Sequence, residues 1–282
     1  MSGTSGKWTS PTVYFAEHPV FTHREFVAAH TVRGRSRHTS NAILARHLAS
    51  GRLVRVRRGL YAAAPPGREH LGFFPDEYLI AAKVRDDGVL AYHTALELHG
   101  VAHSVWWRVQ TLTSGRARRF RFQNVEFVSI QAPREVRALP DFGGGVVLQT
   151  RRGAELRVTT IERTLVDLMH APRHGGGWEE IWRSLEAVEF IDVRAVVEHA
   201  LRMRSALTAA RVGFFLEQHR QEWKVEDAHL EPLLRSKPKQ PLYWDRRRES
   251  GTWVARWGLV IPRTILERGW EEPWCAGEGT DA

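Results

Sequence analysis

The sequence predicts an α+β fold, in which a small N-terminal helical module with a β-hairpin precedes a larger mixed α/β part with a twisted, mainly antiparallel sheet and several helices. Three observations predict this. The length of 282 residues exceeds one average domain. Charge is distributed unevenly along the chain, because residues 1–65 hold ten Lys or Arg residues and only two acids. Their net charge of +8 is nearly all of the chain's net charge of +9. The spacing of the hydrophobic residues also changes along the chain, from the period of helices to the alternation typical of strands and back again.

Composition narrows the class of protein. Hydrophobic residues make up 43% and charged residues 26% of the chain, as in ordinary folded proteins. The single cysteine, Cys275, excludes a disulfide within one chain and fits a reducing compartment. The first residues lack a leader pattern, and no apolar run is long enough to cross a bilayer. We therefore expect a cytoplasmic protein without a membrane segment, metal or cofactor.

The N-terminal elements are predicted from local signals. Residues 11–16 favour a short first helix, and a second helix begins after Thr22, where Glu25 completes a capping box. Residues 32–37 cannot hold a hydrophobic face and predict a turn. A third helix follows, capped by Thr39 or Ser40 and ended by Gly51.

A hairpin closes this module. Residues 53–56 alternate apolar and basic, residues 57–59 form a tight turn with Gly59, and residues 60–62 return. Three helices followed by a hairpin are the order of a winged helix-turn-helix. The Pro-rich stretch at residues 63–67 then marks a boundary. We predict a winged helix-turn-helix domain at 1–66, a second domain at 67–272 and a flexible tail at 273–282.

The second domain is predicted to begin with helices, pass through a sheet and end with helices and a Trp-rich β element. The expected helices cover residues 75–85, 91–99, 159–169, 178–188, 193–203, 208–219 and 263–268, with Thr159 and Glu162 as a capping box. The expected strands cover residues 107–113, 122–130, 146–149, 156–158, 242–244 and 253–261.

The third helix is the candidate DNA-reading element. A helical wheel places three residues on the inner face, namely Leu44, Ala45 and Leu48. The outer face then carries Thr39, Ala42, Ile43, Arg46 and Ser50. Arg46 is the leading base reader, since a guanidinium fork matches guanine O6 and N7, and Ile43 could touch a thymine methyl. Ser40 and Asn41 are candidates for bases or phosphate.

The phosphate contacts are assigned to arginines around that helix. They are Arg35 and Arg37 before it and, on the wing, Arg55, Arg57 and Arg58. A run of charges usually forms only a solvated face. Here residues 26–68 contain nine arginines and no acid, and they coincide with the helix-to-wing order, so DNA binding is favoured.

Other chemistry-bearing residues have simpler interpretations. Glu179, Glu180, Glu186, Glu189 and Asp192 fall on amphipathic helices, where exposed charges are the rule. His170 and His174 have ligand-like spacing, but Pro172 lies between them, so a surface loop is favoured over a metal site. The eleven tryptophans are interpreted as core residues rather than base-stacking platforms.

Several motifs, in order, resemble the AbiEi family of type IV antitoxins. They are residues 51–61 (GRLVRVRRGLY), 91–100 (AYHTALELHG), 160–167 (TIERTLVD), 176–180 (GGWEE), 210–217 (ARVGFFLE) and 256–262 (RWGLVIP). The resemblance covers residues 15–270. It implies a winged domain that binds inverted repeats in its own promoter and represses the operon, as in phage abortive infection systems. It further implies a larger domain that counteracts a nucleotidyltransferase-like toxin, usually without a stable complex.

We therefore expect a non-enzymatic antitoxin and autorepressor, a monomer in solution that binds DNA cooperatively. Two alternatives stay open. One is a winged-helix regulator whose second domain senses a ligand. The other is a DNA-directed nuclease or phosphotransferase, although the residues after Gln218 lack a convincing Asp and Glu-x-Lys strand motif.

Overall fold

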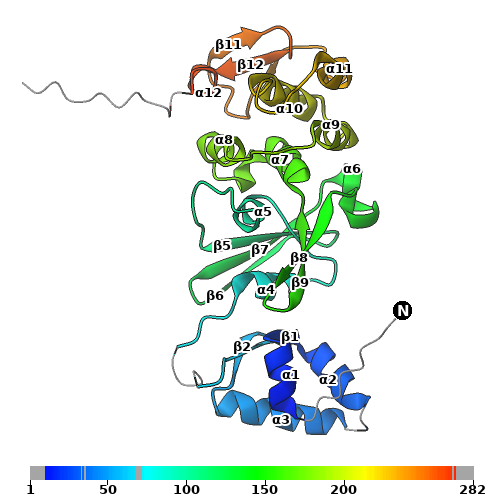
Figure 1. Ribbon diagram of the computed structural model, residues 1–282, viewed down its shortest axis with the longest axis vertical. Coiled ribbons are helices and arrows are strands. Elements are labelled where there is room, and N and C mark those ends of the chain that lie inside the picture. The colour runs from blue at the N-terminus through cyan, green and yellow to red at the C-terminus, as the bar shows by residue number, and fades with distance from the viewer. Residues whose placement is uncertain (1–9, 33, 35, 68–71, 269, 271–282) are drawn as a thin grey trace, which may run out of the picture. The chain divides into compact units, whose positions relative to one another are not determined.

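The computed structural model describes residues 10–32, 34, 36–67, 72–268 and 270, and Figure 1 shows them as a ribbon. The chain divides into two compact units. The first is drawn from Met1–Ala95, Trp106–Ala132 and Val146–Thr159, and the second from Leu96–Val105, Pro133–Gly145 and Thr160–Ala282. The expected boundary after residue 66 lies within the first unit, and the expected tail at 273–282, with Cys275, lies outside the described residues.

The first unit begins with the predicted winged helix-turn-helix. Its elements are α1 (Pro11–Glu17), β1 (Val20–Thr22), α2 (His23–Thr31), α3 (Arg37–Ala49), β2 (Leu53–Arg57) and β3 (Leu60–Ala63). The three strands form an antiparallel sheet in the order β1-β3-β2. The strand β1, which pairs Val20 with Ala62, was not expected from the sequence. The α+β prediction with an N-terminal winged helix is confirmed.

Capping residues set the ends of these helices. The capping box of α2 is present as predicted, with Glu25 Oε2 accepting from the Thr22 backbone N–H at 2.7 Å. The expected cap of α3 at Thr39 or Ser40 is wrong. Ser36 is the N-cap, and its Oγ accepts from the Thr39 backbone N–H at 3.1 Å. The helix therefore starts at Arg37, which the sequence had suggested lies in the preceding turn.

An aromatic cluster forms the core of the winged module. Phe21 and Phe26 are almost fully buried, and the Phe15 ring stacks on both at centroid distances of 5.5 and 5.7 Å. Tyr14 meets the Phe26 ring edge-on at 5.3 Å. These rings bury large apolar areas, which is how so small a module obtains a core.

A six-stranded mixed sheet makes up the rest of the first unit. The elements are α4 (Glu77–Ala82), β4 (Val89–Leu90), α5 (His93–Leu98), β5 (Arg108–Thr113), β6 (Arg118–Phe122), β7 (Val125–Gln131), β8 (Val146–Arg151) and β9 (Ala154–Thr159). The last residues of α5, from Leu96 on, belong to the second unit. The strand order is β6-β7-β5-β4-β9-β8. Three neighbouring pairs are antiparallel, whereas β5 with β7 and β4 with β9 are parallel. The short strand β4 and the edge strand β6 were not predicted.

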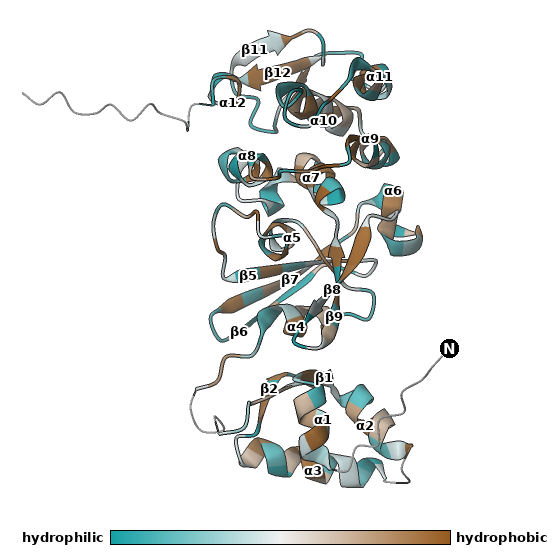
Figure 2. Cartoon of the chain, in the orientation of Figure 1, coloured by the Kyte–Doolittle hydropathy of each residue, from teal (hydrophilic) through white to brown (hydrophobic). Residues whose placement is uncertain are grey.

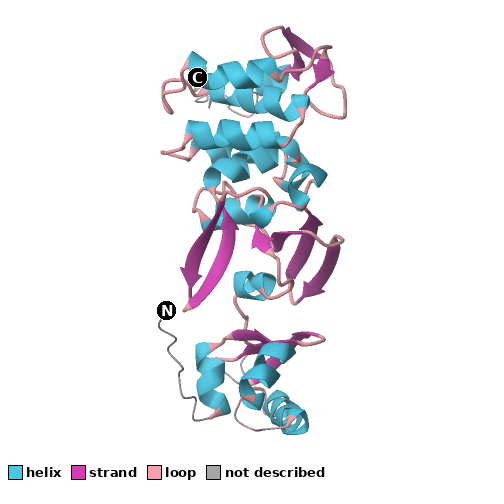
Figure 3. Cartoon of the chain, turned by 90° about the vertical axis from the view of Figure 1, so that its right-hand side faces the viewer, coloured by secondary structure: helices cyan, strands magenta, loops and turns pink. Residues whose placement is uncertain are grey.

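The second unit is mainly helical and carries a small sheet, as the colours of Figure 3 show. Its elements are α6 (Arg134–Arg137), η1 (Pro140–Phe142), α7 (Ile161–His170), η2 (Pro172–His174), α8 (Trp178–Glu186), α9 (Val193–Arg202), α10 (Ala206–Gln218), α11 (Asp227–Arg235), β10 (Leu242–Tyr243), β11 (Gly251–Val254), β12 (Leu259–Pro262) and α12 (Arg263–Leu266). The central strand β12, brown in Figure 2, pairs parallel with β10 and antiparallel with β11.

Two expectations for the second unit need correction. The cap of α7 is Thr160 rather than Thr159, and its Oγ1 accepts from the Arg163 backbone N–H. The helix α11, which contains Pro232, was not expected from the sequence. No helix among the described residues is long and apolar enough to span a membrane.

Several tryptophans pack the core of the second unit, as predicted, but the prediction is wrong for Trp107 and Trp253, which are exposed. Trp182, Trp244 and Trp257 are almost fully buried. Gly213 of α10 lies directly against Trp257, so a Cβ at position 213 would lie 2.0 Å from the indole Cζ3. The close approach of α10 to this ring therefore requires glycine.

A buried arginine joins α7 and α10 to the small sheet. Arg211 donates from Nη1 to the Met169 carbonyl at 2.8 Å and from Nε to the Trp244 carbonyl at 2.7 Å. Its guanidinium also lies 5.0 Å from the Trp178 ring centroid. Burial lowers the pKa of Arg211 to about 10. The group stays protonated at neutral pH and holds two carbonyls in place.

Candidate nucleic-acid interface

The helix α3 presents one polar face to solvent and buries the other. The buried positions are spaced three and four residues apart and comprise Ser40, Ile43, Leu44 and His47. The exposed positions comprise Arg37, His38, Thr39, Asn41, Ala42, Ala45, Arg46 and Ala49. Two of the buried residues are polar, so hydropathy alone does not reveal the inner face. The outer face is the surface that could enter a groove.

The expected outward orientation of Ile43 is wrong, and Ser40, a candidate for contacts with bases or phosphate, is buried. Ser40 is 0% exposed, and its Oγ donates to the Ser36 carbonyl at 3.2 Å. Ile43 is 9% exposed and belongs to the aromatic core of the module. Ala45, which the wheel had placed inward, is exposed. Neither Ser40 nor Ile43 is therefore presented to a ligand by this structure.

Thr39 and Asn41 lie at the start of the exposed face. The Thr39 hydroxyl is 3.0 Å from Ser36 Oγ, within the helix cap. The Asn41 Oδ1 lies 2.7 Å from His23 Nε2, so the first residue of α2 fixes the orientation of this amide. Because the carbonyl oxygen is occupied, the amide NH₂ is the group left to donate to a base or a phosphate.

Arg37 and Arg46 carry the positive charge of α3. Arg37 is the first residue of the helix and Arg46 lies in its last turn. Both side chains are exposed, and neither has an ion pair within the described part of the chain. Arg35, the other arginine expected near this helix, lies outside the described residues.

The wing is a bulged hairpin whose arginines differ in environment. The pairing register between β2 and β3 shifts between Arg55 and Arg57, and Gly59 takes a left-handed φ of 79° in the turn. Arg55 and Arg58 are exposed. Arg52, at the base of the wing, is also exposed, although the sequence had not singled it out. The acid-free composition that pointed to the neighbouring arginines could also have identified Arg52.

Arg57 contacts the protein itself. Its Nη2 donates to the Val84 carbonyl at 2.8 Å, and its guanidinium carbon lies 5.1 Å from the Phe120 ring centroid. Burial lowers the pKa of Arg57, and the nearby charges of Arg85 and Arg118 lower it further. Arg55 and Arg58 are thus exposed to solvent, whereas Arg57 makes an intramolecular contact.

Glu25, one of the two acids of the winged module, forms no ion pair with an exposed arginine of the module among the described residues. Burial raises the pKa of Glu25, but hydrogen bonds from Lys83 and Thr22 outweigh it, and the net shift is downward. The Lys83 Nζ lies 2.5 Å from Glu25 Oε1. This carboxylate is thus already satisfied by Lys83 and by the cap of α2. The outer face of α3 and the wing therefore keep an unbalanced positive charge.

The remaining candidate groups have structural contacts. Glu180 accepts from the Ser104 backbone N–H at 2.9 Å, and Asp192 caps α9. His170 is the last residue of α7, not part of a surface loop as expected, and its Nδ1 lies 2.9 Å from Thr208 Oγ1. Within the described ranges, no group of three or more His, Cys, Asp or Glu side chains could hold a metal.

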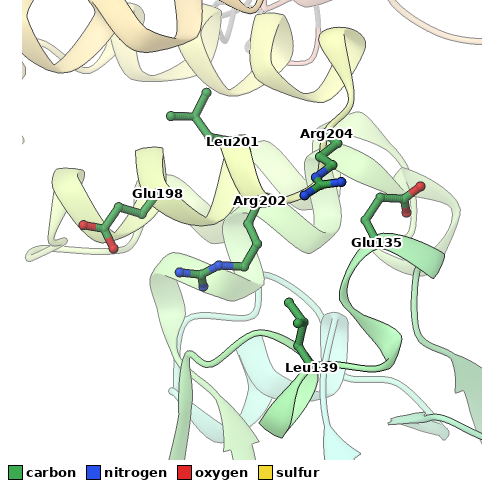
Figure 4. Close-up of a pocket in the computed structure, with 6 residues that line it drawn as sticks. All are labelled: Glu135, Leu139, Glu198, Leu201, Arg202 and Arg204. Carbon is green, nitrogen blue, oxygen red and sulfur yellow. The ribbon is translucent and has the colours of Figure 1, made fainter.

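A surface groove of about 530 Å³ lies between α6 and α9 (Figure 4). Four charged side chains and two leucines line it, namely Glu135, Leu139, Glu198, Leu201, Arg202 and Arg204. Arg202 is already engaged, since its Nη1 donates to the Gly143 carbonyl. Ligand pockets are usually enclosed and mainly apolar. This open groove with charges of both signs does not have that character.

The fold and the exposed basic face define a winged helix-turn-helix protein with a second helical unit. Residues 14–64 match a family model described as "Transcriptional regulator, AbiEi antitoxin", which confirms the resemblance over the winged module. The chain is also similar to the RV2827C protein from Mycobacterium tuberculosis, a solved structure, with a TM-score of 0.55, 18% identity and 92% of each chain covered. At this identity the likeness concerns the fold. None of the curated proteins matches this chain.

Proposed function

We propose that this protein is a DNA-binding antitoxin that represses its own operon. The observation that carries the proposal is the outer face of α3, where exposed Arg37 and Arg46 have no ion pair in the described chain and flank the Asn41 amide. In winged helix-turn-helix proteins this helix lies in the major groove, and the wing contacts the sugar-phosphate backbone. The family match over residues 14–64 supports a regulator of transcription.

Specific recognition is assigned to α3. The Arg46 guanidinium can donate both hydrogen bonds to guanine O6 and N7, and the Asn41 amide can donate to an acceptor on a base edge or phosphate. Thr39 and Arg37 lie at the start of the helix, where they can contact the adjacent backbone. Arg35 completes this group of proposed contacts. Exposed Arg55 and Arg58 would neutralise phosphates beside the wing.

The proposed operator is an inverted repeat in the promoter of the operon. A monomer binds one half-site, and two copies on adjacent half-sites bind cooperatively. The antitoxic part of the function counteracts a nucleotidyltransferase-like toxin without a stable complex and without enzymatic turnover by this chain. It is assigned to the region after residue 66, in keeping with the two-part organisation expected from charge and composition.

The test measures operator binding and rescue with full-length protein. Fluorescence anisotropy with duplex DNA from the region upstream of the gene should show saturable binding that a scrambled duplex competes weakly. Arg46→Ala should lose this preference, whereas Arg194→Ala, which removes an exposed arginine of α9, should keep it. Equal affinity of the unaltered protein for operator and scrambled duplex would contradict a regulatory role.

A second experiment addresses the antitoxin. Cells that express the nucleotidyltransferase-like product of the adjacent gene should resume growth when this chain is supplied. Arg46→Ala should rescue as well as the unaltered protein, because toxin neutralisation is assigned to residues outside the winged module. A protein that represses but never rescues would favour a regulator of another class, including one that responds to a ligand.

A further inference from the structure

The edge strand β6 carries an unusual concentration of arginine. Arg118, Arg119 and Arg121 lie on the strand, and Arg116 lies in the turn before it. All four side chains are exposed. No ion pair joins any of the four to an acid within the described residues. We call these four residues the β6 arginines.

Three acids of the first unit, Glu126 of β7 and Asp86 and Asp87 before β4, are already engaged. Glu126, which lies opposite Arg121 in the β6–β7 pairing, accepts from Arg108 Nε at 2.7 Å. Asp87 accepts from the Ser114 and Thr113 hydroxyls, and Asp86 pairs with Arg24 at 2.9 Å. The β6 arginines therefore add positive charge on both sides of this edge strand, and such charge attracts a polyanion.

Contacts join the tip of the wing to this strand. The Arg57 guanidinium lies over Phe120 of β6, and the Phe120 ring stacks on Phe127 of β7 at 4.8 Å. Side chains alternate along β6, so Arg118 lies on the same side of the strand as Phe120, whereas Arg119 and Arg121 lie on the opposite side. The positive charge of Arg118 also contributes to lowering the pKa of Arg57. The exposed wing residue Arg58 follows Arg57 in the turn, so wing and strand offer adjoining positive charges.

Charged side chains on an edge strand often serve only to prevent strand-to-strand association. Two features favour a ligand here. The residues are all arginine, which suits bidentate phosphate contacts, and the strand adjoins the hairpin that contacts the backbone in this class of fold. Protection against strand association alone would require neither arginine at every position nor a place beside this hairpin.

We propose that the β6 arginines form a second phosphate-binding segment, which extends the contact with duplex DNA beyond the wing to the DNA that flanks the operator half-site. This inference rests on the proposed DNA-binding function. It adds a group of backbone contacts outside residues 1–66. These contacts carry no base specificity and raise affinity and salt dependence alone.

The experiment compares two variants of the full-length chain that lose the same charge. The first replaces the β6 arginines by glutamine, as Arg116→Gln, Arg118→Gln, Arg119→Gln and Arg121→Gln. The matched control removes four exposed charges of the second unit, as Arg173→Gln, Arg194→Gln, Lys239→Gln and Arg246→Gln. Anisotropy is measured from low to physiological salt on a duplex with long flanks and on one trimmed to the inverted repeat.

The measured quantity is the slope of the logarithm of the binding constant against the logarithm of the salt concentration. On the long duplex this slope should be flatter by about 2 for the β6 variant than for the unaltered protein, since each phosphate contact contributes about 0.9. The trimmed duplex should show a smaller difference, and the control variant should follow the unaltered protein. Equal slopes for the β6 and control variants on the long duplex would overturn the inference. A loss of the same size on single-stranded RNA but not on duplex DNA would also overturn it.

Two further measurements keep the test decisive. If the fourfold variant is unfolded by circular dichroism, Arg118→Gln alone should flatten the slope by about one. Hydroxyl-radical footprints of the unaltered protein should show protected sugars outside the repeat on the wing side, and these should weaken in Arg118→Gln. If the unaltered protein binds no duplex, the proposed function fails. If it binds with an unextended footprint, the β6 assignment alone fails.

Discussion

His47 of α3 packs edge-on against Phe15 of α1, with ring centroids 4.9 Å apart. Burial lowers the pKa of His47, and the neighbouring charges of Arg46 and Arg52 lower it further. Both effects favour the neutral form of the imidazole that packs beneath α3. The basic surface of α3 and the histidine beneath it are thus electrostatically coupled.

Acidification should destabilise the winged module through this residue. The folded-state pKa of His47 lies below its ordinary value of 6.5, so the unfolded chain binds more protons in the range between the two values. The stability present above pH 6.5 is then lost as the pH falls toward the folded-state pKa. Thermal unfolding between about pH 7.5 and 5 should show a smaller decline in Tm for His47→Phe. Parallel curves for both proteins would rule out His47 as the cause.

Arg46→Ala should reduce discrimination between operator and scrambled duplex by roughly 1 to 3 kcal/mol, because a bidentate guanine contact is lost. The measurement is the ratio of the two Kd values at a fixed salt concentration. Ala49→Ser, one turn further along the same exposed face, is a suitable control. If Arg46→Ala weakens both duplexes equally, Arg46 contacts phosphate, in keeping with its position in the last turn of α3.

Arg58→Ala and Arg57→Ala should separate two roles on the wing. Arg58 is exposed, so its loss should weaken operator and scrambled DNA alike and flatten the salt slope by about one. Arg57 holds the Val84 carbonyl and lies over Phe120, so its loss should mainly lower Tm. Salt titration and thermal unfolding of both variants test this. A larger slope change for Arg57→Ala than for Arg58→Ala would reverse the assignment.

Gly213→Ala should destabilise the second unit by about 1 to 3 kcal/mol, because the added methyl overlaps the Trp257 ring and forces it to move. Denaturant unfolding followed by tryptophan fluorescence reports this directly. Gly72→Ala is the matched control, since a Cβ there meets nothing within 4 Å. Unchanged stability of Gly213→Ala would show that Trp257 can relax without cost.

Local signals predicted the elements that depend on neighbouring residues. The capping box of Thr22 and Glu25 and the wing turn at Gly59 are decided within a few residues, and both are present. The order of three helices and a hairpin followed from them. The match over residues 14–64 agrees with the motifs read in that region.

Features that depend on distant packing could not be read from the sequence. The inner face of α3 was misplaced because Ser40 and His47 occupy buried positions, where polar residues give no hydrophobic signal. The strands β1 and β4 have only three and two residues, too few for a pattern. The contact of Arg57 with Val84 joins positions 27 residues apart, so composition could not separate it from Arg55 and Arg58.

The Glu25 carboxylate serves two partners at once, the first turn of α2 and the Lys83 ammonium. Substitution of either position 25 or position 83 alone leaves the other group unbalanced, whereas a paired exchange can restore both. The residues at positions 25 and 83 should therefore covary among related sequences, although 58 positions separate them. Such joint variation would mark the winged module and the following region as a single evolutionary unit.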